Sequence, residues 1–197
     1  MRSTEAYWVF AYGSLIWDPG FPYVEKQRAV IHGYHRRFCL YSNHYRGTPE
    51  EPGLVLGLDK GGCCHGVAYA VAPEQTADVR EYLWAREMSS NAYRPVMAPA
   101  RLSDGRRVMA QTFVTVPGHP QYAGRLAADL TARLIASSRG ERGSNQAYLE
   151  NTAAHLSTLG IRDVAMDRLV TEVRQLQQKE GGQVRRPYVA PIPRVGF

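Results

Sequence analysis

The first 116 residues are dominated by short apolar, β-branched and aromatic runs separated by polar turns, a pattern that is typical of β-strands. The expected strands cover residues 7–12, 29–40, 54–58, 64–72, 93–102 and 107–116. Asp59-Lys60-Gly61-Gly62 predicts a hairpin-like turn between the third and fourth strands, and Ser103-Asp104-Gly105 predicts a turn between the last two. The first strand is apolar throughout, which indicates burial on both of its faces.

One helix is expected among these strands and three helices after them. Pro73 suits the first position of a helix, and Val79 and Leu83 recur at helical spacing behind it. Further along the chain, leucines repeat every four residues and form apolar stripes. The expected helices cover residues 74–88, 122–138, 145–159 and 163–178.

This order of elements predicts an α+β fold with a small sheet that is strongly curved or barrel-like. The chain has 197 residues, which suits one substantial domain. We expect that domain to cover residues 1–180. Residues 181–197 contain three prolines and are expected to form an extended tail.

The charge of the chain changes this picture little. Lys and Arg number 24 against 18 Asp and Glu, for a net charge of +6, but the basic residues are scattered. We therefore expect no nucleic-acid partner, because a small acidic substrate needs only a few well-placed arginines.

Residues 7–12 are too short for a signal segment or a membrane span. Cys39, Cys63 and Cys64 form no disulfide framework, which favours a cytoplasmic location.

Several common catalytic motifs are absent from the sequence. It contains no G-x-S-x-G, H-E-x-x-H, P-loop or C-x-x-C motif. His32 and His35 lie three positions apart on an expected strand, so they point to opposite faces and do not share a metal. Cys63-Cys64-His65 is interpreted as packing for the same reason. We expect no metal and no cofactor, which leaves reactions in which the substrate attacks itself or only protons move.

Tyr12-Gly13-Ser14-Leu15 follows directly on a buried strand. Glycine allows a sharp turn and a close approach of the backbone to a ligand. Successive N–H groups in such a turn can form a concavity that binds anions. Taken alone, the four residues are a weak signal, and an ordinary tight turn is the favoured interpretation.

Glu87 is the second candidate. Val79, Leu83 and Glu87 lie at positions i, i+4 and i+8 of the expected helix and share its apolar face. Desolvation there would raise the pKa of the carboxyl group toward neutrality, which suits a proton shuttle. The alternative is a salt bridge with Arg86 or Arg94.

Four separated segments together resemble the ChaC family of γ-glutamylcyclotransferases. The matching segments are Phe10-Ala11-Tyr12-Gly13-Ser14-Leu15-Ile16-Trp17, Tyr45-Arg46-Gly47-Thr48-Pro49-Glu50, Arg86-Glu87-Met88 and Gly143-Ser144-Asn145-Gln146-Ala147-Tyr148-Leu149. Their order and spacing hold from about residue 8 to residue 176. The stretch from Met88 to Tyr93 lacks the glycine pair of the eukaryotic members and looks like the bacterial branch.

The resemblance implies a small mixed β-barrel with helices packed around it, the γ-glutamylcyclotransferase-like fold. It also implies a carbon–nitrogen lyase that cleaves glutathione to 5-oxoproline and cysteinylglycine. Glu87 would be the acid/base, and the loop at residues 12–15 would hold the γ-glutamyl group. Tyr148 and Asn145 would line the site.

In the implied reaction, the α-amine of the substrate attacks its own γ-carbonyl group. The backbone N–H groups of residues 13–15 would stabilise the oxyanion. Arg46 is expected to bind a carboxylate of glutathione, because its guanidinium fork matches that group. Tyr93 is a further expected substrate contact, and Arg94 is a weaker candidate.

Two alternatives stay open at this point. The enzyme could act on other γ-glutamyl amines or dipeptides, or the protein could be a non-catalytic regulator that binds glutathione. We expect a monomer or a weak homodimer without a membrane partner.

Overall fold

The computed structural model describes residues 6–88 and 90–189, which belong to two compact units. The first, here called the barrel unit, takes in the chain up to Arg37 and Gly57–Val116. The second, the helical unit, takes in Phe38–Leu56 and the chain from Pro117 onward. The expected single domain over residues 1–180 stays a prediction. The described part of the expected tail contains no helix or strand, and residues 190–197 lie outside the described residues.

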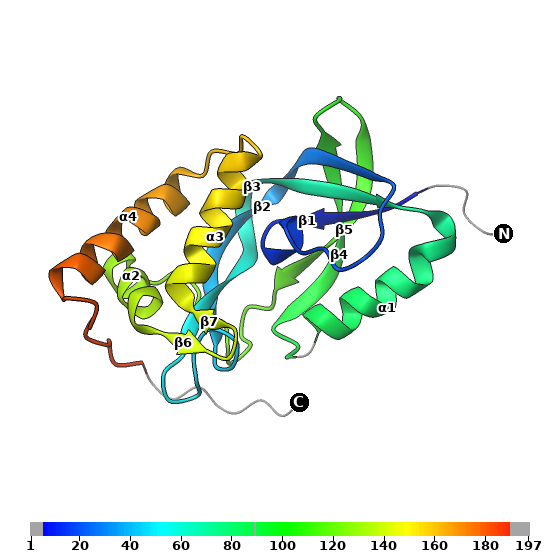
Figure 1. Ribbon diagram of the computed structural model, residues 1–197. Helices are drawn as coiled ribbons and strands as arrows, with labels where there is room; N and C mark the ends of the chain where they lie inside the picture. Colours follow the sequence, from blue (N-terminus) through cyan, green and yellow to red (C-terminus); the bar gives the residue numbers. More distant parts are fainter. Residues whose placement is uncertain (1–5, 89, 190–197) are drawn as a thin grey trace. The chain divides into compact units, whose positions relative to one another are not determined.

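Five strands form a closed barrel in the order β1-β3-β2-β4-β5 (Figure 1). Their bounds are β1 (Tyr7–Ala11), β2 (Glu25–Ser42), β3 (Gly53–Val71), β4 (Tyr93–Leu102) and β5 (Arg107–Thr115). Strand β1 pairs antiparallel with β3 and parallel with β5. The expected mixed barrel in an α+β fold is therefore confirmed. The end of β2 and the start of β3 belong to the helical unit.

The barrel unit is filled by side chains that are almost completely buried. They include Val9, Phe10, Ile31, Leu58, Tyr69, Leu83 and Phe113. All five residues of β1 are buried, as its apolar sequence predicts. This first strand leads directly into the loop that carries Gly13.

The expected hairpin turn at residues 59–62 is wrong, because β3 runs through this segment as one strand of 19 residues. Gly61 and Gly62 have φ angles of 95° and 70°, conformations that also occur in tight turns. Here they lie beside β2: the Arg37 guanidinium is 3.1 Å from the Asp59 carboxylate, and His35 Nδ1 is 2.9 Å from the Gly61 carbonyl oxygen. These contacts with the neighbouring strand keep the segment extended.

The expected first helix is confirmed. A short 3-10 turn, η2 (Pro73–Gln75), leads into α1 (Thr76–Glu87). Val79 and Leu83 are its buried residues, and Glu87 is its last. Asn91 follows with a φ angle of 55°, a left-handed conformation that asparagine tolerates, before the chain enters β4.

The helical unit contains three helices that contact one another (Figure 1). They are α2 (Ala128–Ser137), α3 (Asn145–Thr158) and α4 (Val164–Lys179). Two of them begin with a side-chain cap, since Ser144 Oγ accepts a hydrogen bond from Ala147 N and Asp163 Oδ1 accepts one from Met166 N. A small hairpin of β6 (Arg139–Gly140) and β7 (Gly143–Ser144), which was not predicted from the sequence, lies between α2 and α3.

Helix α2 begins at Ala128, so the expected start of this helix at residue 122 is wrong. The preceding segment pairs with the end of β2 instead. Tyr41 N donates to the Gln121 carbonyl at 2.8 Å, and Ala123 N donates to the Cys39 carbonyl at 2.9 Å. These bonds use the backbone groups that a helix would need.

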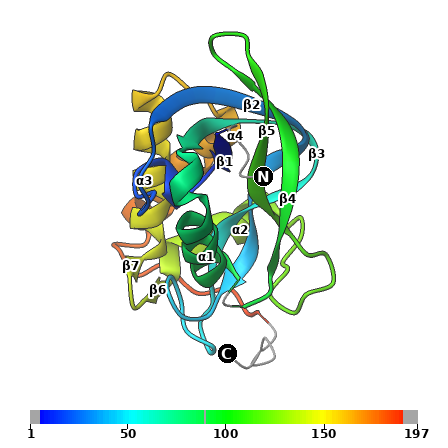
Figure 2. The ribbon, with the colours of Figure 1, turned by 90° about the vertical axis from the view of Figure 1, so that its right-hand side faces the viewer.

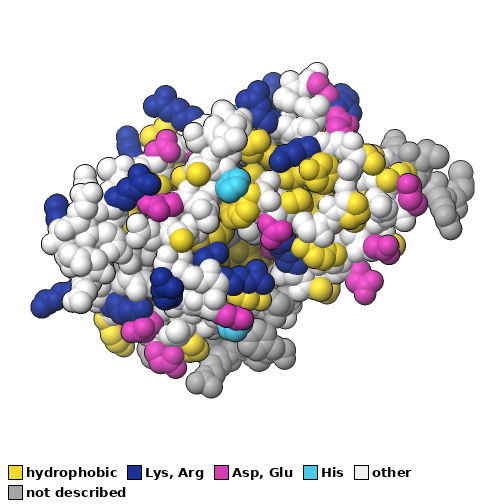
Figure 3. All heavy atoms as spheres, in the orientation of Figure 1, with side chains coloured by type: hydrophobic (Ala, Val, Ile, Leu, Met, Phe, Trp, Pro, Cys, Tyr) yellow, Lys and Arg dark blue, Asp and Glu magenta, His cyan; other side chains and the backbone are white. Residues whose placement is uncertain are grey.

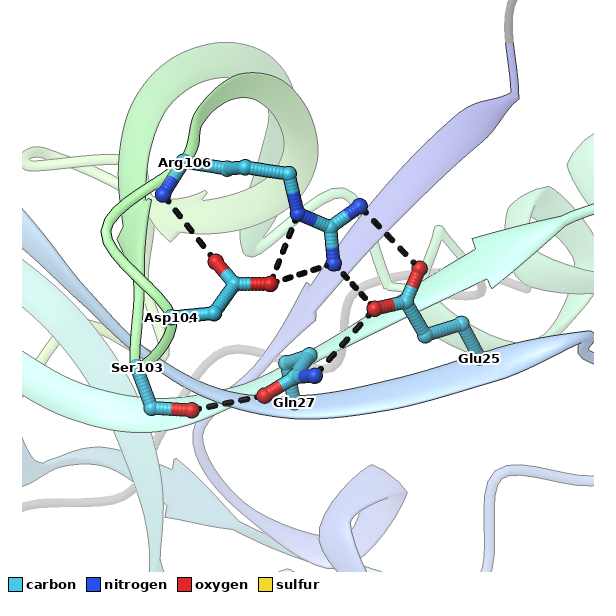
Figure 4. Close-up of polar contacts among 5 residues, drawn as sticks. All are labelled: Glu25, Gln27, Ser103, Asp104 and Arg106. Carbon is cyan, nitrogen blue, oxygen red and sulfur yellow. Dashed lines mark hydrogen bonds and ion pairs between the residues drawn. The ribbon is translucent and has the colours of Figure 1, made fainter.

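The turn of the β4–β5 hairpin, drawn in green in Figure 2, is joined to the start of β2 by a polar network (Figure 4). Arg106 bonds the carboxylates of Glu25 and Asp104, and Ser103 Oγ donates to Gln27 Oε1 at 2.6 Å. The guanidinium also lies 5.6 Å from the ring centre of Trp8. Strands β2 and β4 pair through a short ladder of three register pairs. The polar network therefore provides additional contacts between these two strands.

Arg106→Ala is expected to lower the melting temperature at pH 7 by about 1–3 °C, the small effect of exposed ion pairs. Hydrogen bonds from Arg106 hold the pKa of Glu25 and of Asp104 below their ordinary values of 4.5 and 3.8. Their contribution is therefore present above those values and is lost as the pH falls through the lowered pKa values. Melting curves of both proteins should differ at pH 7, and the difference should shrink as the pH falls through the lowered pKa values. Arg107→Ala, at the first position of β5, is the control, and an equal loss at every pH would contradict the account.

The face of the molecule in Figure 3 carries Lys, Arg, Asp and Glu side chains interspersed, without a large area of one sign. No helix in the described part of the chain is long and apolar enough to cross a membrane.

Candidate active site

Glu87 lies at the end of α1 with its side chain 17% exposed. Burial raises the pKa of its carboxyl group above the ordinary value, and the neighbouring Arg86 charge lowers it by less. Arg86 Nε is 3.5 Å from Glu87 Oε1, so part of the expected alternative, a salt bridge with Arg86, is also present. The site therefore contains a largely buried carboxyl group that can accept a proton nearer neutral pH than a free glutamate.

The loop after β1 forms a short 3-10 turn, η1 (Ser14–Ile16). Its carbonyl groups are used internally: Gly13 O accepts from Ile16 N, and Ser14 O accepts from Asp18 N, both at 2.9 Å. The N–H groups of Gly13, Ser14 and Leu15 have no acceptor among the described residues. Since Gly13 and Leu15 are buried, unpaired N–H groups at this place point to a ligand that supplies the acceptor.

Arg86 joins this loop to the end of α1. Its Nη2 donates to Ser14 Oγ at 3.1 Å, and its Nη1 donates to the Asp18 carbonyl at 2.8 Å. The same guanidinium is paired with Glu87, so it contacts both the acid and the loop. In the barrel unit, Arg86 thus links Glu87 to the Gly13–Leu15 loop, and the expected roles of both at a substrate stay predictions.

Arg46 belongs to the helical unit. Its Nη1 donates to the carbonyls of Arg142 and Ser144, and its guanidinium lies 5.1 Å from the ring centre of Tyr148. It pairs with no carboxylate among the described residues, and burial lowers its pKa. A half-buried guanidinium without an anion is costly, and its remaining nitrogen atoms form an edge suited to a carboxylate.

Asn145 has a backbone-binding role that the sequence analysis missed. Its side chain is fully buried; Oδ1 accepts from Leu54 N at 2.6 Å, and Nδ2 donates to Leu54 O at 2.7 Å. Both polar groups therefore fix the start of β3. We interpret Asn145 as a residue that shapes the helical unit, and its expected contact with a substrate stays a prediction.

The three expected tyrosines lie in different elements. Tyr148, in α3, is 8% exposed and packs edge-on against Phe38, with ring centres 5.9 Å apart. Tyr12 is buried, and its carbonyl accepts a hydrogen bond from Arg36 Nε at 2.6 Å. Tyr93 is half-buried and opens β4, opposite Thr115. Their contacts with a substrate stay predictions.

Among the described residues, no group of three or more His, Cys, Asp or Glu side chains is placed to hold a metal ion. In the same part of the chain, Cys39, Cys63 and Cys64 form no disulfide.

A family model described as "ChaC-like protein" matches residues 7–176. The glutathione-specific γ-glutamylcyclotransferase of Escherichia coli is 38% identical to this chain, over 86% of the chain and 73% of the relative. The protein of the same description from Schizosaccharomyces pombe is 34% identical, over 87% and 94%. The crystal structure of a yeast γ-glutamylcyclotransferase specific to glutathione superposes with a TM-score of 0.78 at 27% identity, over 87% of this chain and 96% of that one. The expected γ-glutamylcyclotransferase-like fold is confirmed by this similarity.

Proposed function

Because the chain belongs to the ChaC-like protein family, we propose that it is a glutathione-specific γ-glutamylcyclotransferase, which releases 5-oxoproline and cysteinylglycine from glutathione. The observation that carries the proposal is a largely buried Glu87 joined through Arg86 to a loop whose N–H groups at residues 13–15 have no acceptor in the part of the chain that the structure describes. Such a site offers a base and an oxyanion-binding group, which are the two elements that an intramolecular acyl transfer needs.

In the first step, Glu87 accepts a proton from the α-ammonium group of glutathione. The raised pKa of its carboxyl group makes the carboxylate a better base at neutral pH. The free amine then attacks the γ-carbonyl carbon and forms the new C–N bond of the five-membered ring. Because the amine and the γ-carbonyl belong to one molecule, the protein needs no nucleophile of its own and only has to hold glutathione in a folded conformation. Well-oriented intramolecular reactions reach effective molarities of ~10⁵ M or more.

In the second step, the N–H groups of Gly13, Ser14 and Leu15 donate to the oxyanion of the tetrahedral intermediate. One donor of this kind is worth about 10²–10³ in rate. The intermediate collapses when Glu87 returns its proton to the cysteinyl nitrogen, which leaves as the amine of cysteinylglycine. The ring nitrogen, which carries two hydrogens after the attack, gives up one of them, and this proton ends on the released amino group. The electron pair of the broken C–N bond goes to that nitrogen, and no water is consumed.

Arg46 is our candidate for binding one of the carboxylates of glutathione. The Tyr148 ring and two backbone carbonyls hold its guanidinium, while its free edge has no anion among the described residues. A carboxylate placed there would form charge-assisted hydrogen bonds and offset the cost of burying the cation.

The direct test is mass-spectrometric detection of 5-oxoproline and cysteinylglycine after the purified protein is mixed with glutathione. A comparison of kcat/KM between glutathione and simple γ-glutamyl dipeptides distinguishes the proposed specificity from a broader γ-glutamylcyclotransferase. We expect a clear preference for glutathione. If glutathione binds and neither product forms, the result would contradict the proposed enzymatic function and favour a non-catalytic regulator that binds glutathione.

Tyr148→Phe is expected to lower kcat/KM for glutathione about tenfold, the loss of one hydrogen bond of ordinary strength. The Phe ring keeps the packing against Phe38 and the stacking with Arg46, so the folded structure should be retained. Steady-state kinetics and a melting curve measure the two effects. Tyr188→Phe, at an exposed position of the same unit, is the control. Wild-type kinetics for Tyr148→Phe would mean that the ring serves only packing.

We also propose a cytoplasmic location and a monomer or weak dimer for the enzyme. Three free cysteines fit a reducing compartment.

A further inference from the structure

We propose that Tyr69 and Arg86 are positioning residues, which hold the loop after β1 so that the N–H groups of Gly13, Ser14 and Leu15 face a ligand. This inference rests on the proposed function, because the ligand of that loop is the γ-glutamyl group. Neither residue is assigned a contact with the reacting atoms. Tyr69 acts through the loop, whose N–H groups make that contact; Arg86 acts through the loop and is also paired with Glu87.

Tyr69 approaches the loop from inside the barrel. Its side chain, on β3, is fully buried, and its hydroxyl donates to the Ile16 carbonyl at 2.8 Å. The rings of Phe21 and Tyr23 pack against it at 5.7 and 4.8 Å between ring centres, which fixes its orientation. Burial raises the pKa of Tyr69, so the hydroxyl stays protonated and remains a donor throughout the physiological range. Without this donor, the buried Ile16 carbonyl would lose its partner.

Arg86 approaches the same loop from α1. It donates to Ser14 Oγ and to the Asp18 carbonyl, which are the two ends of the turn. Tyr82, one helical turn earlier, accepts a hydrogen bond from Arg86 Nη1 at 2.7 Å. The Tyr82 hydroxyl lies 1.9 Å from the point where a Cβ atom on Gly20 would lie, and Gly20 has a φ angle of 70°. Only glycine fits there, so the loop closes tightly against this helix.

These contacts have one property in common, and it explains why the N–H groups of residues 13–15 lack an acceptor among the described residues. Each donor bonds an oxygen atom of the loop: Tyr69 bonds Ile16, Arg86 bonds Ser14 and Asp18, and Arg36 bonds the Tyr12 carbonyl. The N–H groups of residues 13–15 share their peptide units with the carbonyls of Tyr12, Gly13 and Ser14, which accept from Arg36 Nε, Ile16 N and Asp18 N, so rotation of any of these units would break a hydrogen bond. Tyr69 and Arg86 in turn hold the carbonyls of Ile16 and Asp18, the residues that close this turn. The N–H groups of residues 13–15 therefore stay available, and the loop needs no rearrangement when the oxyanion forms.

Tyr69→Phe removes one of these donors and keeps the ring packing. In the protein without ligand, hydrogen exchange of a peptide that spans residues 12–18 should become about 3- to 10-fold faster. The kcat for glutathione should fall about 10- to 100-fold with a change in KM of less than about threefold, because misplaced donors weaken the transition state more than substrate binding. Tyr7→Phe is the matched control: Tyr7 is a buried tyrosine of the same barrel whose hydroxyl bonds no atom of the loop among the described residues.

Arg86→Met and Arg86→Lys test the other side of the loop. We expect the same faster exchange in both variants, because one ammonium group cannot bond Ser14 and Asp18 as a planar guanidinium does. Arg80→Met, which removes an arginine from the same helix that stacks on Tyr7, should behave as wild type.

Unchanged exchange and unchanged kcat in both Tyr69→Phe and Arg86→Met would overturn the inference. So would a loss of activity that merely follows a loss of folded protein in the melting curve. A wild-type protein that makes no 5-oxoproline would contradict the proposed function instead. In that case the exchange measurement on the unliganded protein still decides whether Tyr69 and Arg86 hold the loop.

Discussion

Glu87→Gln should lower the kcat for glutathione by about 10²–10⁴ and leave the fold intact. Glutamine has nearly the shape of glutamate, so it fills the same largely buried position, but its amide cannot accept the α-ammonium proton. Initial rates of 5-oxoproline formation measure the loss. Glu81→Gln, at an exposed position of the same helix, should retain wild-type rates.

The pH dependence of kcat and of stability, compared between wild type and Glu87→Gln, gives an independent check. The raised pKa of Glu87 means that kcat should fall as the pH drops through that pKa, at a pH above the ordinary value of 4.5. For stability the sign is opposite: a raised carboxyl pKa favours folding at low pH, and this contribution is lost as the pH rises through the pKa of the folded state. Glu87→Gln should therefore be as stable as wild type or more stable at pH 7 to 8. A glutamine variant with wild-type kcat would remove Glu87 from the mechanism.

Arg46→Met should raise the KM for glutathione by roughly 10- to 150-fold and change kcat much less, because it removes hydrogen bonds from a charged group to the substrate. Arg46→Lys should restore little of this affinity, since an ammonium group does not reproduce the paired bonds of a guanidinium. Methionine keeps an unbranched side chain beside the Tyr148 ring.

Arg139→Met serves as the control for Arg46, because it removes an exposed arginine from the same unit. Steady-state kinetics on the purified variants separate KM from kcat. If Arg46→Met leaves KM unchanged, Arg46 has a structural role and the substrate carboxylate binds elsewhere.

Local sequence signals predicted the elements whose conformation depends on near neighbours. The bounds of β4 follow from an alternating pattern and a Ser-Asp-Gly turn, and the inward position of Glu87 follows from the regular spacing of Val79 and Leu83 in α1. The exposure of Trp84 on the same helix agrees with this orientation.

Local sequence signals gave wrong or incomplete predictions where a partner far away in the sequence determines the conformation. Gly61 and Gly62 have turn-like φ angles, yet contacts with β2 keep them within one strand. Tyr69 bonds a residue 53 positions away, and Asn145 bonds one 91 positions away. The spacing of residues along the sequence predicts neither pairing. Tyr69 does stand out in composition, because it is the single tyrosine among small and β-branched residues in Val67–Val71. The open N–H groups of the loop are likewise a property of its hydrogen-bonding surroundings.

The most direct test of intramolecular attack is the reaction of wild-type protein with glutathione in H₂¹⁸O, followed by mass spectrometry of both products. Attack by the substrate's own amine consumes no water, so 5-oxoproline should carry no ¹⁸O and should form in equal amount to cysteinylglycine. Glutamate that carries ¹⁸O in its γ-carboxylate would show hydrolysis by water and would contradict the mechanism proposed for Glu87 and the Gly13–Leu15 loop.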